Sequence, residues 1–280
     1  MHKALHLVVL LLTATFAHAV AANEPILTIS GHGSKTDYTR IELLQHPDLA
    51  SVLIVGDVAY HRDRRYQAVP VAALLERLHP DPDSVIQFIA TDGFVAELPV
   101  APLLNREPGK ALAYLAVEPA DKPWPALKPG SKLSAGSFYL VWLNPERAPI
   151  GPEQWPYQVA RIEVRPPLRQ RWPALAPGPE VPKDAAINLG FAVYQKHCFA
   201  CHRLNRSGDA TQAPDLNVPM NPTEYFQPRA LRQLIRNPQS VRYWSGQSMP
   251  AFDEKTLPDR GLEDLLAYLE YMAGRKTDTK

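Results

Sequence analysis

The sequence predicts two domains of different fold class, the first α+β or mostly β and the second all-α. The chain has 280 residues, a length at which two domains are expected. Short apolar segments of strand character fill residues 23–165, whereas residues 184–280 carry apolar positions at helical spacing. A proline-rich stretch at residues 166–183 separates these parts and predicts a linker.

Residues 1–22 predict an export signal. A basic start at Lys3 is followed by an apolar run from Leu5 to Phe16 and then by small residues, and cleavage after Ala19, Ala21 or Ala22 fits equally well. An uncleaved anchor is the alternative, but this run is short for a bilayer span. We therefore expect a soluble periplasmic protein with no membrane span after signal removal. The formal net charge of +1 indicates no nucleic-acid partner.

Strand patterns dominate the first domain. Two helical patches interrupt them, residues 39–45 and residues 71–78, and the second follows Pro70, which suits the start of a helix. No glycine-rich phosphate loop is present, so a doubly wound nucleotide-binding fold is disfavoured. The predicted strands are residues 25–30, 51–58, 85–90, 111–117, 138–143 and 157–164.

Two stretches of this domain carry a resemblance. Residues 66–75 lead through Pro70 into a helix, and residues 90–99 form an Asp-Gly-aromatic hairpin. Together with the late strand around Trp142 and residues 155–159, they resemble the sulfite-oxidase-type molybdopterin-binding domain. This resemblance implies molybdenum held by a cysteine thiolate ahead of the helix.

The matching region, residues 54–61, contains no cysteine. Asp57 and His61 are predicted as a turn residue and a surface residue rather than as metal ligands. We therefore expect the fold without molybdopterin, since a fold does not carry its function with it.

The basic run at residues 61–65 is predicted as a solvated loop, with an anion-binding or docking loop as the alternative. The proline-rich linker is either extended or packed along a domain through Leu168, Trp172 and Leu175.

Both cysteines of the chain lie in the segment Cys198-Phe199-Ala200-Cys201-His202. This spacing is typical of covalent c-type haem attachment, because each thiol adds across one vinyl group and the next residue offers its imidazole to the iron. A disulfide, a redox dithiol, a zinc site and chance are the alternatives. A zinc site needs two further ligands, and only His197 is near in sequence. Cysteines one turn apart bridge poorly, and no thioredoxin-like pattern accompanies them.

Motifs around this segment fall in a recognisable order. Gly190 and Phe191 lie in a predicted helix before it, the carbonyl of Pro214 follows it, and residues 261–272 show helical spacing. Residues 184–275 therefore resemble a class I cytochrome c. The resemblance implies that the Pro214 carbonyl accepts the Nδ1–H of His202, and that Gly190 and Phe191 pack against the last helix.

The resemblance also implies a distal thioether from residues 248–252. The spacing favours Met249 as the second axial ligand, because the chain from His202 to Met249 is long enough to wrap the haem edge. Met220 lies too near His202 in sequence, and Met272 is predicted as core. Arg242 and Trp244, just before the distal loop, are candidates for bonding a haem propionate. The arginines of the helical stretch at residues 228–236 are predicted to be solvated.

These features predict a periplasmic carrier of single electrons with one covalent haem c, ligated by His202 and Met249. A closed His/Met haem suits electron transfer more than catalysis. The expected partner is a periplasmic or membrane-bound redox protein, docked with the help of the first domain. The alternatives are a haem-containing molybdenum oxidoreductase subunit and a redox- or ligand-sensing binding protein.

Overall fold

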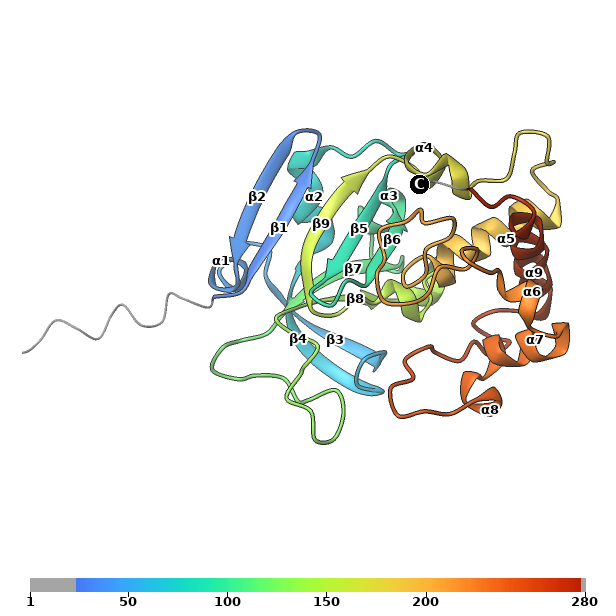
Figure 1. The fold of residues 1–280 in the computed structure, drawn as a ribbon. Helices are drawn as coiled ribbons and strands as arrows, with labels where there is room; N and C mark the ends of the chain where they lie inside the picture. Colours follow the sequence, from blue (N-terminus) through green and yellow to red (C-terminus); the bar gives the residue numbers. More distant parts are fainter. Residues whose placement is uncertain (1–23, 278–280) are drawn as a thin grey trace, which may run out of the picture.

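The computed structural model describes residues 24–277 and shows a β-rich part beside a helical part (Figure 1). The predicted export signal at residues 1–22 lies outside the described residues. Within residues 24–277, no helix is both long and apolar enough to cross a membrane. The predicted fold classes, a mostly β first domain and a helical second domain, are confirmed.

Two sheets form the first domain. One has the strand order β2-β1-β9-β5-β6, in which β1 pairs with β9 in parallel and the other pairs are antiparallel. The second has the order β3-β4-β7-β8 and is antiparallel throughout. The strands are β1 (Ile26–Gly31), β2 (Ser34–Thr39), β3 (Ala50–Asp57), β4 (Arg62–Pro70), β5 (Val85–Ala90), β6 (Val95–Pro99), β7 (Leu112–Val117), β8 (Phe138–Leu143) and β9 (Val159–Arg165).

The helices of this domain are short. The predicted helical patches appear as α1 (Arg40–Leu44) and as α2 (Val71–Leu75), which continues into a 3-10 turn. A third helix, α3 (Val100–Leu103), follows β6. One apolar core joins the two sheets, and Trp142, Tyr66 and Tyr139 are its largest fully buried side chains. The 3-10 turns are Glu76–Leu78, Pro145–Arg147 and Pro152–Gln154.

Residues 61–65 are largely exposed, as predicted, but they do not form a loop, because strand β4 begins at Arg62 and pairs with β3. The guanidinium of Arg64 lies 4.3 Å from the ring centroid of Tyr60. Asp57 is likewise not a simple turn residue, since it is completely buried and accepts hydrogen bonds from the backbone N–H of Tyr60 and the hydroxyl of Tyr66. His61 is exposed, as expected.

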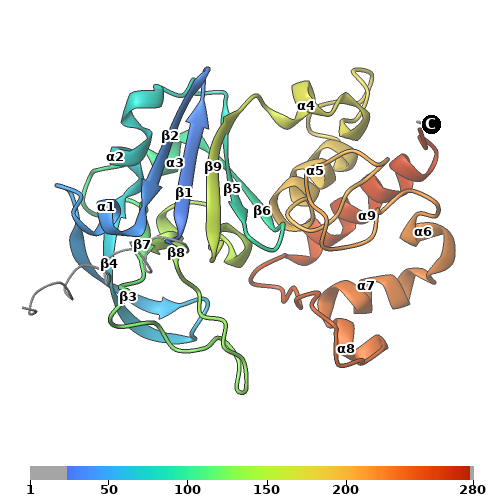
Figure 2. The same cartoon turned by 60° about the vertical axis from the view of Figure 1, so that its left-hand side comes forward.

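The proline-rich stretch is folded rather than extended. It contains α4 (Leu168–Arg171) and a 3-10 turn at Pro173–Leu175, and Figure 2 shows α4 above α5, where the chain from β9 enters the helical part. Leu168 and Leu175 are buried in the core of the second domain, and Trp172 packs against that core. Of the two arrangements left open by the sequence, the packed one is observed, because these apolar side chains gain more from burial than from exposure on a spacer.

Helices α5 (Ala186–Val193) and α9 (Asp259–Ala273) form the centre of the second domain. They cross at Gly190, where a Cβ atom would lie 1.9 Å from the backbone oxygen of Asp264. The rings of Phe191 and Tyr268 are 5.5 Å apart at the same crossing. The predicted packing of the first helix on the last is therefore confirmed. The remaining helices are α6 (Pro222–Tyr225), α7 (Pro228–Arg236) and α8 (Pro238–Val241).

The side chain of Arg232 in α7 is exposed, as the sequence predicts, although it is paired, whereas that of Arg236 is more enclosed than predicted. Arg232 forms a two-pronged ion pair with Glu263 of α9. Arg236 donates to the carbonyl oxygens of Phe252 and Leu257 at 2.9 and 2.5 Å and also pairs with Asp259. The guanidinium has enough donors to hold several oxygens at once. Arg236 therefore fixes the segment that connects the distal loop to α9.

Candidate functional site

The Cys-x-x-Cys-His segment lies shortly after α5, which ends at Val193. That helix runs into a π-helical turn, Tyr194–Cys198, a form that often occurs at functional sites. The backbone N–H of Cys201 and that of His202 both donate to the carbonyl of Cys198, at 3.1 and 2.8 Å. The turn therefore presents both sulfur atoms and the imidazole from one short, hydrogen-bonded stretch.

Neither cysteine is in a disulfide. Burial, followed by the negative charge of Glu153, raises the pKa of the Cys198 thiol to about 12. Burial and the carboxylates of Asp92 and Glu153 raise the pKa of the Cys201 thiol to about 11. Redox dithiols and zinc sites use thiolates, which require a lowered pKa. The surroundings of these two thiols therefore keep them neutral, unlike the activated thiolate of a redox dithiol.

His202 is held by the contact that the sequence predicts. Its Nδ1 lies 2.7 Å from the carbonyl oxygen of Pro214, so Nδ1–H donates and Nε2 carries the lone pair that a metal ion needs. Burial lowers the pKa of His202, while the Pro214 carbonyl and Asp215 act in the opposite direction. The imidazole is accordingly neutral near pH 7, which is the form that ligates iron.

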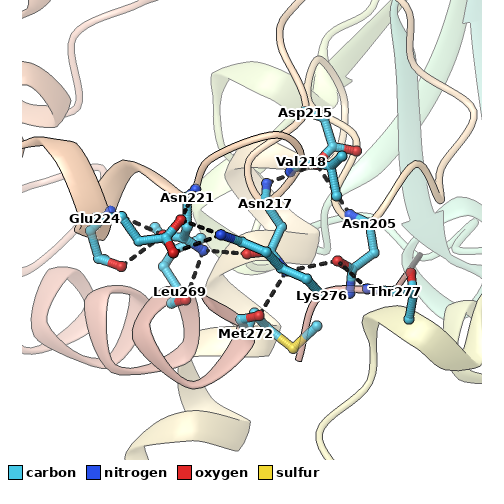
Figure 3. Close-up of polar contacts among 11 residues, drawn as sticks. Asn205, Asp215, Asn217, Val218, Asn221, Glu224, Leu269, Met272, Lys276 and Thr277 are labelled. Atoms are coloured by element: carbon cyan, nitrogen blue, oxygen red, sulfur yellow. Dashed lines mark hydrogen bonds and ion pairs between the residues drawn. The ribbon is translucent and has the colours of Figure 1, made fainter. Parts of the chain in front are cut away.

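A network of buried asparagines fixes the loop that carries Pro214 (Figure 3). Asn217 donates 2.7 Å hydrogen bonds to the Met272 carbonyl and to the side chain of Asn205. Asn221 donates to the Leu269 carbonyl at 2.9 Å and to Asn217 at 2.8 Å. The loop is thereby tied to the last two turns of α9. Sequence reasoning did not find this network, although the asparagines recur within one short loop.

Asp215 organises the same loop from within. Its Oδ1 accepts the backbone N–H groups of Asn205, Asn217 and Val218, at 3.1, 2.7 and 2.9 Å. Its Oδ2 accepts the N–H of Arg206 at 2.5 Å. Each bond satisfies a backbone amide of the loop, and Pro214 directly precedes this carboxylate. The position of the Pro214 carbonyl therefore depends on Asp215.

The candidate distal ligands have different surroundings. Met249 is half-buried and packs against the core of the second domain, whereas the side chain of Met220 is 51% exposed. Met272 is buried in α9, as predicted. Arg242 and Trp244 both lie in an exposed stretch, with the guanidinium 6.0 Å from the centroid of the indole. Their predicted contact with a propionate stays a prediction.

Residues 187–273 match the family model of cytochrome c. This segment is a cytochrome c domain. It implies a haem c and a role in electron transfer, and the match begins near the start of α5 and ends with α9. The match does not extend into the first domain. No curated protein matches the chain.

The residues of the cytochrome domain fit the haem that the family implies. Two thiols one turn apart suit the two vinyl groups, and a neutral imidazole with a fixed Nδ1–H suits the iron. Met249 would offer a soft, neutral thioether, a type of ligand that favours ferrous iron. When bound, haem supplies the one-electron Fe(II)/Fe(III) couple. The chain would hold this group through the imidazole of His202, whose Nδ1–H is fixed by the Pro214 carbonyl.

The first domain contacts the cytochrome motif directly, which sequence reasoning did not predict. The N–H of Val95, in β6, donates to the carbonyl oxygen of Ala200 at 3.2 Å. Gly93, at φ +89°, lies so close to Thr211 that a Cβ atom would be 2.6 Å from its hydroxyl. The Asp92-Gly93 turn therefore does more than close a hairpin, because it brings the first domain against the segment that carries both cysteines.

Proposed function

We propose that the protein is an exported carrier of single electrons with one haem c, attached through thioether bonds at Cys198 and Cys201. His202 and Met249 are the axial ligands in this proposal. The observation that carries it is the Cys-x-x-Cys-His turn of the cytochrome domain, in which His202 Nδ1 lies 2.7 Å from Pro214 O. Both iron positions are then filled by protein, so electrons pass through the haem without a substrate binding to it.

The proposed compartment is the periplasm. The apolar run near the N-terminus supports it, because the pattern is that of an export signal. The partner in this proposal is a periplasmic or membrane-bound redox protein. The first domain lies beside the cytochrome motif, so a partner that approaches this side meets both domains. This placement supports a docking role for the first domain.

The first domain, in this proposal, has the sulfite-oxidase-type fold without molybdopterin. The hairpin of β5 and β6 with its Asp92-Gly93 turn, and the entry of β4 into α2 through Pro70, support the likeness. The chain offers no thiolate for molybdenum, since both cysteines belong to the haem motif. Asp57, considered as a replacement ligand, is buried and already accepts two hydrogen bonds.

Equilibrium redox titration of the purified holoprotein tests this function. The visible spectrum should change reversibly between two forms and follow a one-electron Nernst curve. Because both axial positions are filled, the reduced form should not change its spectrum under carbon monoxide at neutral pH. Ready binding of carbon monoxide would indicate an open iron position and would contradict the carrier role in favour of ligand sensing or catalysis.

A further inference from the structure

His197 lies between the two domains, directly before Cys198. Its Nδ1 is 3.0 Å from Oε2 of Glu153, a residue of the first domain. The side chains of His197 and Glu153 are only 4% and 9% exposed. On another side, the imidazole stands edge-on to Phe252, with ring centroids 5.6 Å apart. His197 is therefore in contact with the first domain and with the last residue of the distal loop.

Phe252 ends the loop that carries Met249. Its ring is buried, and its N–H donates to the carbonyl oxygen of Ile235 at 3.1 Å. Its own carbonyl accepts from Arg236 at 2.9 Å. The backbone of Phe252 is thus fixed to α7, while its ring packs on His197. The direction in which the loop leaves this point depends on both contacts.

The turn that carries Glu153 is attached to both domains. Its neighbour Gln154 accepts, through its backbone oxygen, the indole N–H of the buried Trp142 at 2.9 Å. The Gln154 side chain donates to the carbonyl oxygen of Lys196 at 2.9 Å and accepts the N–H of Gly151 at 2.8 Å. Glu153 is therefore presented to His197 from a rigid base, because strand β8 supplies Trp142.

We propose that Glu153 is a positioning residue for the distal loop and acts through His197 and Phe252. The carboxylate accepts the Nδ1 proton of His197 and holds the ring at one angle, and the ring in turn supports Phe252. The first domain thereby keeps the loop with Met249 closed over the haem. This inference rests on the proposed haem attachment and adds a function for the first domain inside the molecule.

Imidazole binding to the oxidised holoprotein tests the inference, because added imidazole reaches the iron only when the loop opens. Glu153→Ala leaves a buried N–H without an acceptor, and the observed binding rate should rise roughly tenfold. Glu153→Gln should restore the slow rate, since its amide oxygen can accept the same proton. Phe252→Leu, which keeps the site apolar and does not touch Glu153, should also raise the rate.

A matched control separates loop positioning from general loosening of the domain interface. Gln87→Leu removes a 2.8 Å hydrogen bond to Asp209 across the same interface but away from His197. It should leave the imidazole rate unchanged. Hydrogen exchange of residues 249–253 in the holoprotein should follow the same order, faster in Glu153→Ala and unchanged in Gln87→Leu.

The outcomes separate this inference from the proposed function. A haem-loaded wild type whose Glu153→Ala and Phe252→Leu variants bind imidazole at the wild-type rate would overturn the inference alone. An equal rise in Gln87→Leu would also overturn it, since the effect would then be general. A wild type that carries no covalent haem would overturn both. If the Glu153→Ala variant cannot be purified with its haem, the imidazole-binding rate of the Phe252→Leu variant decides the outcome.

Discussion

Buried polar side chains decide where the functional atoms of the cytochrome domain lie. Asn205, Asn217 and Asn221 are each 1% exposed or less, and each would cost free energy if left unpaired. Asn217 and Asn221 each donate to a carbonyl group of α9 and to a neighbouring asparagine, and Asn205 donates to the carbonyl oxygen of Arg275, just after α9. The loop with Pro214 gains a fixed shape from these bonds, and His202 gains a fixed ring orientation.

Met249 and Met220 provide a matched pair of substitutions at the residue scale. Met249→Ala should abolish the weak near-infrared sulfur-to-iron band of the oxidised protein. It should also lower the midpoint potential by on the order of 100 mV, because the thioether favours ferrous iron. Met220→Ala should change neither, since that side chain is 51% exposed. Near-infrared spectroscopy and redox titration measure both effects. If Met220→Ala lost the band and Met249→Ala kept it, the assignment of Met249 as the distal ligand would be contradicted.

The site residues that could be predicted from the sequence are close together along the chain, and their spacing indicates their chemistry. Cys198, Cys201 and His202 lie within one turn, so a local pattern predicts them. Glu153 and Arg236 act on residues from distant parts of the chain. No local pattern marks a carboxylate in a 3-10 turn as the partner of a histidine in another domain, so these two were not predicted.

At the scale of elements, the crossing of α5 and α9 holds the cytochrome domain together. Gly190 permits the backbones to approach closely, and Phe191 and Tyr194 of the first segment pack on Tyr268 of the second with ring centroids 5.5 Å apart in each case. The hydroxyl of Tyr268 donates to the carbonyl oxygen of Leu175 at 2.7 Å. The linker is thereby attached to the same crossing.

Gly190→Ala tests this crossing. The new methyl group would meet the backbone oxygen of Asp264, which cannot rotate away, so one helix must shift. The free energy of unfolding should fall by about 3 kcal/mol or more. Gly274→Ala is the control, since its methyl group would lie 3.7 Å from the nearest atom, the Tyr271 oxygen, and should change stability by less than about 0.5 kcal/mol. Urea unfolding of the holoproteins compares them, and equal midpoints would contradict the crossing.

Strands were predictable only where their side chains are apolar. The predicted segments at residues 85–90 and 138–143 coincide with β5 and β8, both of which are largely buried. Strand β2, with the sequence SKTDYT, and the first half of β4 are polar and exposed. Their pairing depends on backbone hydrogen bonds to β1 and β3, which the side-chain pattern does not reveal. Strand β6 was predicted only as part of the hairpin at residues 90–99.

At the scale of the whole molecule, charged and polar groups join the two domains. Arg171 of α4 pairs with Glu97 of β6 and, at 2.7 Å, with Asp209 of the cytochrome domain. Gln87 donates to both carboxylates, at 3.2 and 2.8 Å. Burial raises the pKa of Glu97, whereas hydrogen bonds from Gln87 and Arg171 lower that of Asp209 against the effect of burial. The sequence predicted two domains, but the linker's composition gave no sign of this close contact.

The central claim is that haem is covalently bound to Cys198 and Cys201, and its fate on denaturation tests this most directly. After acid–acetone extraction and denaturing electrophoresis, haem should migrate with the polypeptide. Mass spectrometry should find it on the peptide that contains both cysteines. The double variant Cys198→Ala/Cys201→Ala should yield little stable holoprotein, and metal analysis of the wild type should show iron without stoichiometric molybdenum. Haem that leaves the wild-type polypeptide during extraction would contradict the account.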